Sequence, residues 1–152
     1  MTLLIRPDDW NLPLFVHVAG AMVLLGALLL AAVVLAGVGR AGEPTQVVTL
    51  TRFGFRTLLA AALPAFVVMR VGAEWIASEE DLDDEPWIGV GYITSDGGLV
   101  FLVAAIIVAG LSLRRARKGG RPASLARAAA ILSFVIIAAF LVAVWAMTTK
   151  PD

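Results

Sequence analysis

The sequence predicts an all-α membrane protein, a bundle of four transmembrane helices. Hydrophobic residues make up 60% of the 152 residues, charged residues make up 16%, and the mean hydropathy is +0.90. Soluble domains are usually about 45–50% apolar and about 25% charged. The apolar residues also fall into four stretches near the length that a helix needs to cross a bilayer. We therefore expect one polytopic membrane domain over residues 1–152.

The expected spans follow these stretches in order: residues 13–39, 53–77, 94–113 and 128–149. Pro13 fits the first turn of the first span, where its missing N–H leaves no helical hydrogen bond unmade. Each span should be helical, because a lipid-exposed backbone must close its hydrogen bonds internally.

The charges predict the orientation. The loop after the first span carries Arg40, Arg52 and Arg56 against Glu43, and the loop 114–127 carries five arginines and one lysine with no acid. The loop between the second and third spans has no basic residue. Cytoplasmic loops are enriched in Lys and Arg. We therefore expect the basic loops in the cytoplasm, both termini outside, and a multi-pass location in the plasma (inner) membrane.

The second span holds the strongest functional signal. Arg70 lies seven residues before Ala77, about 10 Å below the expected outer boundary at the rise of a helix. Such a charge usually faces a bundle interior or a cavity. One interpretation is a structural or partner-facing ion pair with Glu74, one turn away, and the other is contact with a ligand or cofactor. Pro64, in the middle of this span, predicts a bend.

His17 is the single histidine, and the predicted topology places it in the same leaflet as Arg70. It would either form a hydrogen bond to a neighbour such as Glu74 or serve as an axial ligand of haem b. In the second case Met69 or Met147 would supply the other ligand, and Arg70 would neutralise a propionate. A copper site of His17 and the two methionines is a further alternative, because thioethers are soft ligands.

The remaining features favour packing and membrane contact over catalysis. Zero cysteines exclude a thiolate metal site, and no catalytic residue or dedicated metal site is predicted. Trp75 and Trp145 belong to an expected aromatic belt, which also makes them candidate partner-facing residues. The loop Arg114–Arg127 suits anionic lipid, whereas nothing around it favours nucleic acid. Three pairs of alanines spaced four residues apart suit close packing, either within the chain or in a homo-oligomer: Ala27/Ala31, Ala105/Ala109 and Ala139/Ala143.

The first span resembles that of a group of bacterial membrane proteins. The residues that carry the resemblance are Leu14-Phe15-Val16-His17-Val18-Ala19-Gly20-Ala21-Met22-Val23-Leu24-Leu25-Gly26, a histidine early in the helix followed by small residues. The group includes small four-helix proteins of unknown function, the copper-resistance D domain and HemJ-type protoporphyrinogen oxidases. The resemblance implies a four-helix membrane fold, and it implies haem binding at His17.

Three functions are consistent with these residues. The first is a non-enzymatic accessory or small oligomeric membrane component, in which Arg70 and Glu74 form a structural or partner-facing pair. The second is a b-type haem or copper protein that uses His17. The third is a small transporter or channel with an outer cavity near Arg70.

Overall fold

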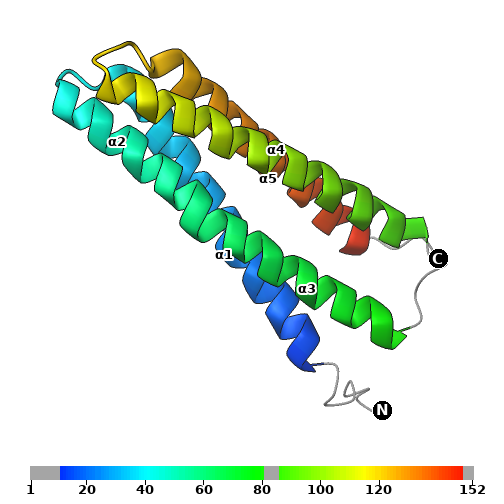
Figure 1. Cartoon of the computed structure of the whole chain (residues 1–152). Coiled ribbons are helices and arrows are strands. Elements are labelled where there is room, and N and C mark those ends of the chain that lie inside the picture. The colour runs from blue at the N-terminus through cyan, green and yellow to red at the C-terminus, as the bar shows by residue number, and fades with distance from the viewer. Residues whose placement is uncertain (1–10, 81–85, 149–152) are drawn as a thin grey trace.

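The computed structural model describes residues 11–80 and 86–148, which form an all-α bundle (Figure 1). Its elements are α1 (Asn11–Gly37), a 3-10 turn η2 (Val38–Arg40), α2 (Pro44–Thr57), a π turn η3 (Leu58–Ala62), α3 (Leu63–Glu80), α4 (Pro86–Arg117) and α5 (Ala123–Thr148). Four helical segments are long and apolar enough to cross a membrane, which confirms the predicted fold class and indicates a multi-pass membrane protein.

The second segment begins earlier than predicted. The sequence predicts a loop up to residue 52, but the helix starts at Pro44, with proline in its first turn, and runs through α2, η3 and α3 to Glu80. Hydropathy detects only the part of a helix that lies in lipid. The polar start of α2 is helical nevertheless, because Thr51 and Gly54 are buried, Gly54 directly against Leu35 of α1.

A π turn lies just before Pro64, the residue at which the sequence predicts a bend. Proline lacks the N–H of a helical hydrogen bond, and its ring clashes with the carbonyl four residues earlier. The helix widens over Leu58–Ala62, directly before the proline, which accommodates both effects. The Pro64 side chain is exposed, so it faces away from the bundle.

The third and fourth segments are also longer than the predicted spans. α4 extends beyond residues 94–113 at both ends, and α5 begins at Ala123 where the sequence predicts 128. The extra turns near the basic end are held by burial. Ala116 and Ala126 are buried there, and the Ser112 hydroxyl donates to the Pro122 carbonyl at 3.2 Å across the α4–α5 connection.

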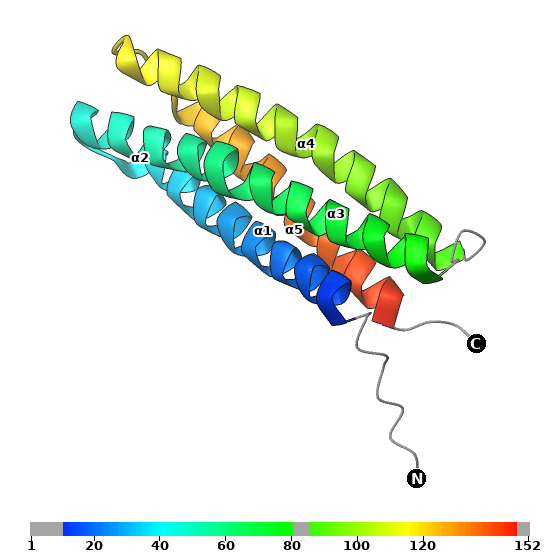
Figure 2. The same cartoon turned by 60° about the horizontal axis from the view of Figure 1, so that its bottom comes forward.

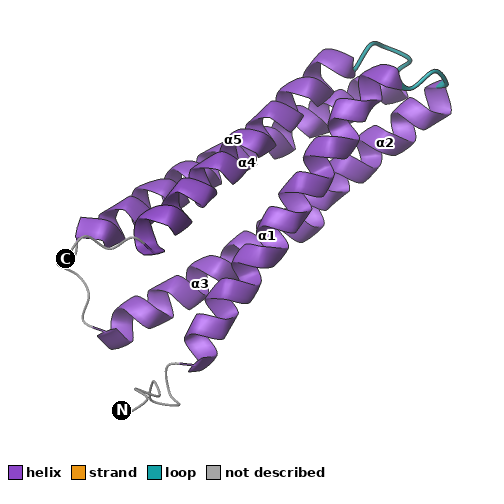
Figure 3. Ribbon diagram, turned by 180° about the vertical axis from the view of Figure 1, so that it is seen from behind, coloured by secondary structure: helices purple, strands orange, loops and turns teal. Residues whose placement is uncertain are grey.

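The helices pair as α1 with α3 and α4 with α5. The two pairs meet through α1 with α5 and through α2 with α4, whereas α3 barely contacts α4. Figures 1 and 3 show the consequence: the ribbons of α3 and α4 diverge toward the end of the bundle that holds the start of α1 and the end of α5. We call this end the terminal end.

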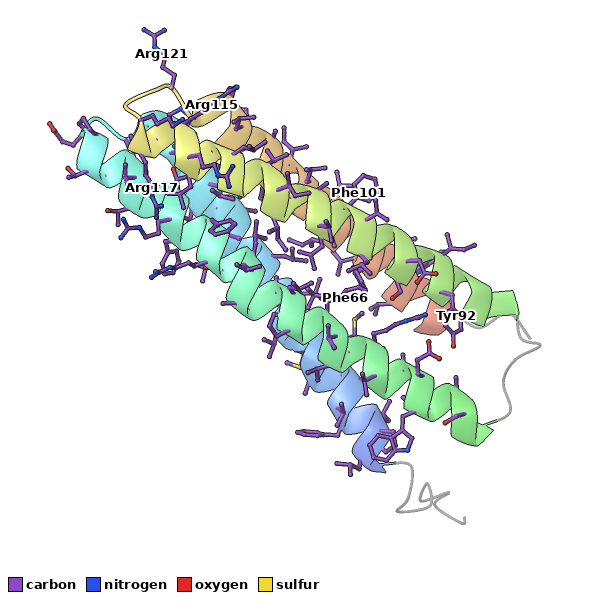
Figure 4. The ribbon with its side chains drawn as sticks, in the orientation of Figure 1. Phe66, Tyr92, Phe101, Arg115, Arg117 and Arg121 are labelled. Carbon is purple, nitrogen blue, oxygen red and sulfur yellow. The ribbon has the colours of Figure 1, made fainter. Side chains whose placement is uncertain are left out.

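The opposite end is basic. The α1–α2 and α4–α5 connections both lie there (Figure 2), and Arg115, Arg117 and Arg121 project from it (Figure 4). The nine basic residues of the two predicted cytoplasmic loops are all exposed: Arg40, Arg52, Arg56, Arg114, Arg115, Arg117, Lys118, Arg121 and Arg127. The basic loops that the sequence predicts to share one side of the membrane therefore lie at one end of the bundle.

Small residues occupy much of the core. Ala31, Ala105 and Ala109 are completely buried, and Ala27 is buried one turn before Ala31. Two of the alanine pairs that predict close packing therefore act within the chain. Large apolar side chains such as Met22 face outward, as expected where lipid takes the place of water.

Candidate functional site

α1 and α3 approach backbone to backbone near the terminal end. A Cβ atom on Gly20 of α1 would lie 2.5 Å from the backbone nitrogen of Met69, and one on Gly72 of α3 would lie 2.5 Å from the backbone nitrogen of His17. Real Cβ atoms essentially never come that close. The two glycines therefore permit a contact that any larger residue would prevent, and this contact fixes His17 beside Met69.

The His17 ring bonds to the neighbouring helix. Its Nδ1 lies 2.9 Å from the Met69 carbonyl oxygen. Because a carbonyl only accepts, Nδ1 carries the proton and donates, which leaves the lone pair of a neutral ring on Nε2. The predicted neighbour of His17 is Glu74, whereas its partner is the Met69 backbone. This hydrogen bond of the single histidine thus connects α1 to α3.

The two methionines predicted as candidate ligands are Met69 and Met147. The Met69 side chain is only 4% exposed and belongs to the apolar core, so the residue meets His17 through its carbonyl oxygen. The Met147 side chain lies outside the described part of the structure. The contact between α1 and α3 limits where a haem could bind at His17. The helices are too close at Gly20 and Gly72 for a porphyrin to lie between them. A haem on Nε2 would therefore lie on another side of the His17 ring.

Arg70 is the centre of a second arrangement, which we call the polar cluster: Arg70, Glu74, Tyr92 and Asp96. The Arg70 Nη2 atom lies 2.9 Å from Glu74 Oε1 and 3.6 Å from Asp96 Oδ1. The Tyr92 hydroxyl donates to Glu74 Oε2 at 3.1 Å, and the Arg70 guanidinium carbon lies 4.5 Å from the centre of the Tyr92 ring. The predicted pair with Glu74 is present, and it is extended by two residues of α4.

The polar cluster bridges the helices where they diverge. Arg70 and Glu74 belong to α3, Tyr92 and Asp96 to α4, and these two helices barely touch elsewhere. Figure 4 shows Tyr92 between the two ribbons on the side of the terminal end. Exposure of the side chains rises from 27% for Arg70 to 50% for Glu74 and 73% for Asp96. The guanidinium is thus partly buried, and its carboxylate partners face outward.

One polar atom beside the polar cluster has no hydrogen-bond partner among the described residues. Ser95 precedes Asp96 on α4 and is 6% exposed, and its buried hydroxyl oxygen bonds to nothing there. By contrast, the buried hydroxyl of Ser133 on α5 donates to the Ala129 carbonyl at 2.9 Å. An unsatisfied buried hydroxyl destabilises the fold by about 1–3 kcal/mol.

The two tryptophans predicted to face a partner are both exposed. Trp75 lies on α3 next to Glu74, and Trp145 lies near the end of α5. Their positions near the terminal end suit an aromatic belt at the headgroups. Within the described residues, no group of three or more His, Asp or Glu side chains is placed to hold a metal ion.

Sequence reasoning missed Asp96 and the roles of Gly20 and Gly72. A signal for Asp96 does exist, because it lies one helical turn after Tyr92 at the edge of an apolar stretch. No comparable signal marks the two glycines, since a glycine in a membrane helix can equally well face away from the other helices, as Gly26 does.

Comparison with known proteins adds no relative: no protein-family model, curated protein or solved structure matches the chain.

Proposed function

We propose that the chain is a non-enzymatic accessory or small oligomeric component of the plasma membrane, in which the polar cluster is a structural joint that also faces a partner. The observation that carries the proposal is the contact of Arg70 and Glu74 on α3 with Tyr92 and Asp96 on α4, two helices that otherwise barely touch. Each ionic group of the cluster lies within reach of an opposite charge, as a joint between helices requires.

The orientation belongs to the same proposal. The basic end would face the cytoplasm, in line with the excess of Lys and Arg in cytoplasmic loops, and the polar cluster would lie in the outer half of the bilayer. A partner would then reach the polar cluster from the outer surface or from within the outer leaflet. Glu74 and Asp96, which are at least half exposed, are the groups that it would meet first.

Removal of the guanidinium tests the joint. Arg70→Ala leaves two largely exposed carboxylates without their cation, and exposed ion pairs contribute about 0.2–1 kcal/mol each. We expect the free energy of unfolding in micelles to fall by about that amount, while Arg52→Ala, at an exposed arginine for which the described residues show no ion pair, leaves it nearly unchanged. Equal stabilities of the two variants would contradict the proposal.

A second candidate function, a b-type haem protein, is favoured by the His17 hydrogen bond. Histidines that ligate a metal almost always donate the other ring N–H to a carbonyl or carboxylate, which fixes the tautomer. With Nδ1 donating to Met69, Nε2 of His17 is in the form that would bind iron, and the iron would supply electron-transfer chemistry. An absorption spectrum of the purified protein, expressed with haem precursor, separates the candidates. The first function expects no Soret band, and the second expects one that His17→Ala removes.

A further inference from the structure

The charges of the polar cluster do not balance. One guanidinium serves two carboxylates, so the polar cluster carries one excess negative charge. Both oxygens of Glu74 have partners, because Oε1 faces Arg70 and Oε2 accepts from Tyr92. Among the described residues, Asp96 has one ion pair, at 3.6 Å and so beyond hydrogen-bond length, and its side chain is 73% exposed. Asp96 is therefore the carboxylate that has room for another cation.

The guanidinium of Arg70 also has unused capacity. It has five N–H donors in a planar fork, and both of its ion-pair contacts within the described residues are made by Nη2. These two contacts leave N–H donors on its other two nitrogens. A ligand with both a cationic and an anionic group would thus find a carboxylate and a guanidinium within a few ångströms of each other.

In the proposed orientation, the spacing of residues along α4 puts Asp96 of the polar cluster near the level where lipid headgroups begin. Asp96 and Arg114 on α4 are separated by 18 residues, which spans about 27 Å along a helix. The hydrocarbon core of a bilayer is about 30 Å thick. With the basic end at one surface of the core, Asp96 therefore falls near the other surface, within reach of phosphate and amine groups.

We propose that the polar cluster binds the headgroup of an aminophospholipid, with its ammonium on Asp96 and its phosphate on the Arg70 nitrogens other than Nη2. This inference rests on the proposed partner-facing role and names that partner as phosphatidylethanolamine. A primary ammonium donates three hydrogen bonds, which suits a carboxylate. The trimethylammonium of phosphatidylcholine donates none and prefers aromatic faces, and Arg70 already covers one face of the Tyr92 ring. Phosphatidylglycerol lacks a cation to offset the excess carboxylate.

Lipid titration of the purified full chain in micelles, followed by native mass spectrometry, tests the proposal. The probes are phosphatidylethanolamine, phosphatidylcholine and phosphatidylglycerol with identical acyl chains. We expect phosphatidylethanolamine to bind about tenfold more tightly than phosphatidylcholine, the ratio that one charge-assisted hydrogen bond provides. Asp96→Asn should remove this preference and Asp96→Glu should retain it. Glu43→Gln, at an exposed acid of the basic end, is the matched control and should leave it unchanged.

The result that overturns the inference is equal binding of the two zwitterionic lipids, or a preference that survives Asp96→Asn. Tightest binding of phosphatidylglycerol, unaffected by Asp96→Asn, would also overturn it and would assign lipid binding to the basic end. The joint is tested separately, because Asp96→Asn leaves two contacts between α3 and α4 in place, the Tyr92–Glu74 hydrogen bond and the Arg70 contact with the Tyr92 ring. A stable Asp96→Asn protein without lipid preference therefore supports the lipid site, whereas full stability of Arg70→Ala refutes only the joint.

Discussion

Replacement of Gly20 by alanine tests the close contact between α1 and α3. The new Cβ would lie 2.5 Å from the Met69 backbone nitrogen and 2.8 Å from its Cα, whereas ordinary van der Waals contact begins at 3.4 Å. The helices would have to separate by about 0.9 Å at this level. Since the obstacle is the backbone of another helix, no side-chain rotation can relieve the clash.

The expected magnitude follows from two losses. Overpacking a well-packed core costs about 1–3 kcal/mol, and a backbone obstacle puts this site at the upper end of that range. Separation of the helices also lengthens the 2.9 Å hydrogen bond from His17 to Met69, which contributes about 1 kcal/mol. We therefore expect Gly20→Ala to lower the free energy of unfolding by about 3–4 kcal/mol, partly offset by the better helix propensity of alanine.

The matched control is Gly26→Ala in the same helix. Its Cβ would have no neighbour within 4 Å, so only the helix propensity changes and the variant should gain about 0.5–1 kcal/mol. Unfolding of both variants by transfer from mild micelles into sodium dodecyl sulfate, followed by circular dichroism, gives the comparison. If Gly20→Ala were as stable as Gly26→Ala, the backbone contact between α1 and α3 would be wrong.

Three further predictions concern orientation, His17 and the buried serines. Because the chain contains no cysteine, single cysteines at the exposed Gly42 and Ser78 report which side of the membrane each residue faces. In intact cells an impermeant maleimide should label Ser78→Cys only. Labelling of Gly42→Cys alone would show that the orientation is the opposite of the predicted one. His17→Ala should lower the free energy of unfolding by about 1 kcal/mol through loss of its hydrogen bond, and an unchanged value would mean that the bond contributes nothing. Ser95→Ala should leave the free energy of unfolding unchanged or raise it by up to about 3 kcal/mol. Ser133→Ala, which removes a hydroxyl that has a hydrogen-bond partner, should not raise it. A lower free energy of unfolding for Ser95→Ala would reveal a partner of its hydroxyl.

The sequence predicts the helices well because hydropathy and backbone hydrogen bonding decide them. Bilayer thickness fixes the minimum length of a span, but not where the helix ends beyond the lipid. The helix that contains the second span therefore starts at Pro44, outside the predicted span, and Thr51 in this added part is buried against the bundle. The apolar pattern carries no information about contacts between helices.

Some contacts of the candidate site can likewise be predicted from the sequence, and others cannot. The Arg70–Glu74 pair follows from a spacing of four residues within one helix, so it can be predicted. The part played by Asp96 depends on the relative height of α3 and α4, and the His17 bond depends on which helix faces α1. Both are properties of the packed bundle, set by side chains far from the site in sequence.

The central claim is that the polar cluster holds α3 and α4 together at the terminal end. The distance between spin labels tests it most directly, with cysteines placed at the exposed Val71 on α3 and Ile93 on α4 of the cysteine-free chain. With Arg70 intact, double electron–electron resonance in lipid nanodiscs should give one narrow distance distribution. Arg70→Ala should broaden it and shift it to longer distances, whereas an unchanged distribution would contradict the claim.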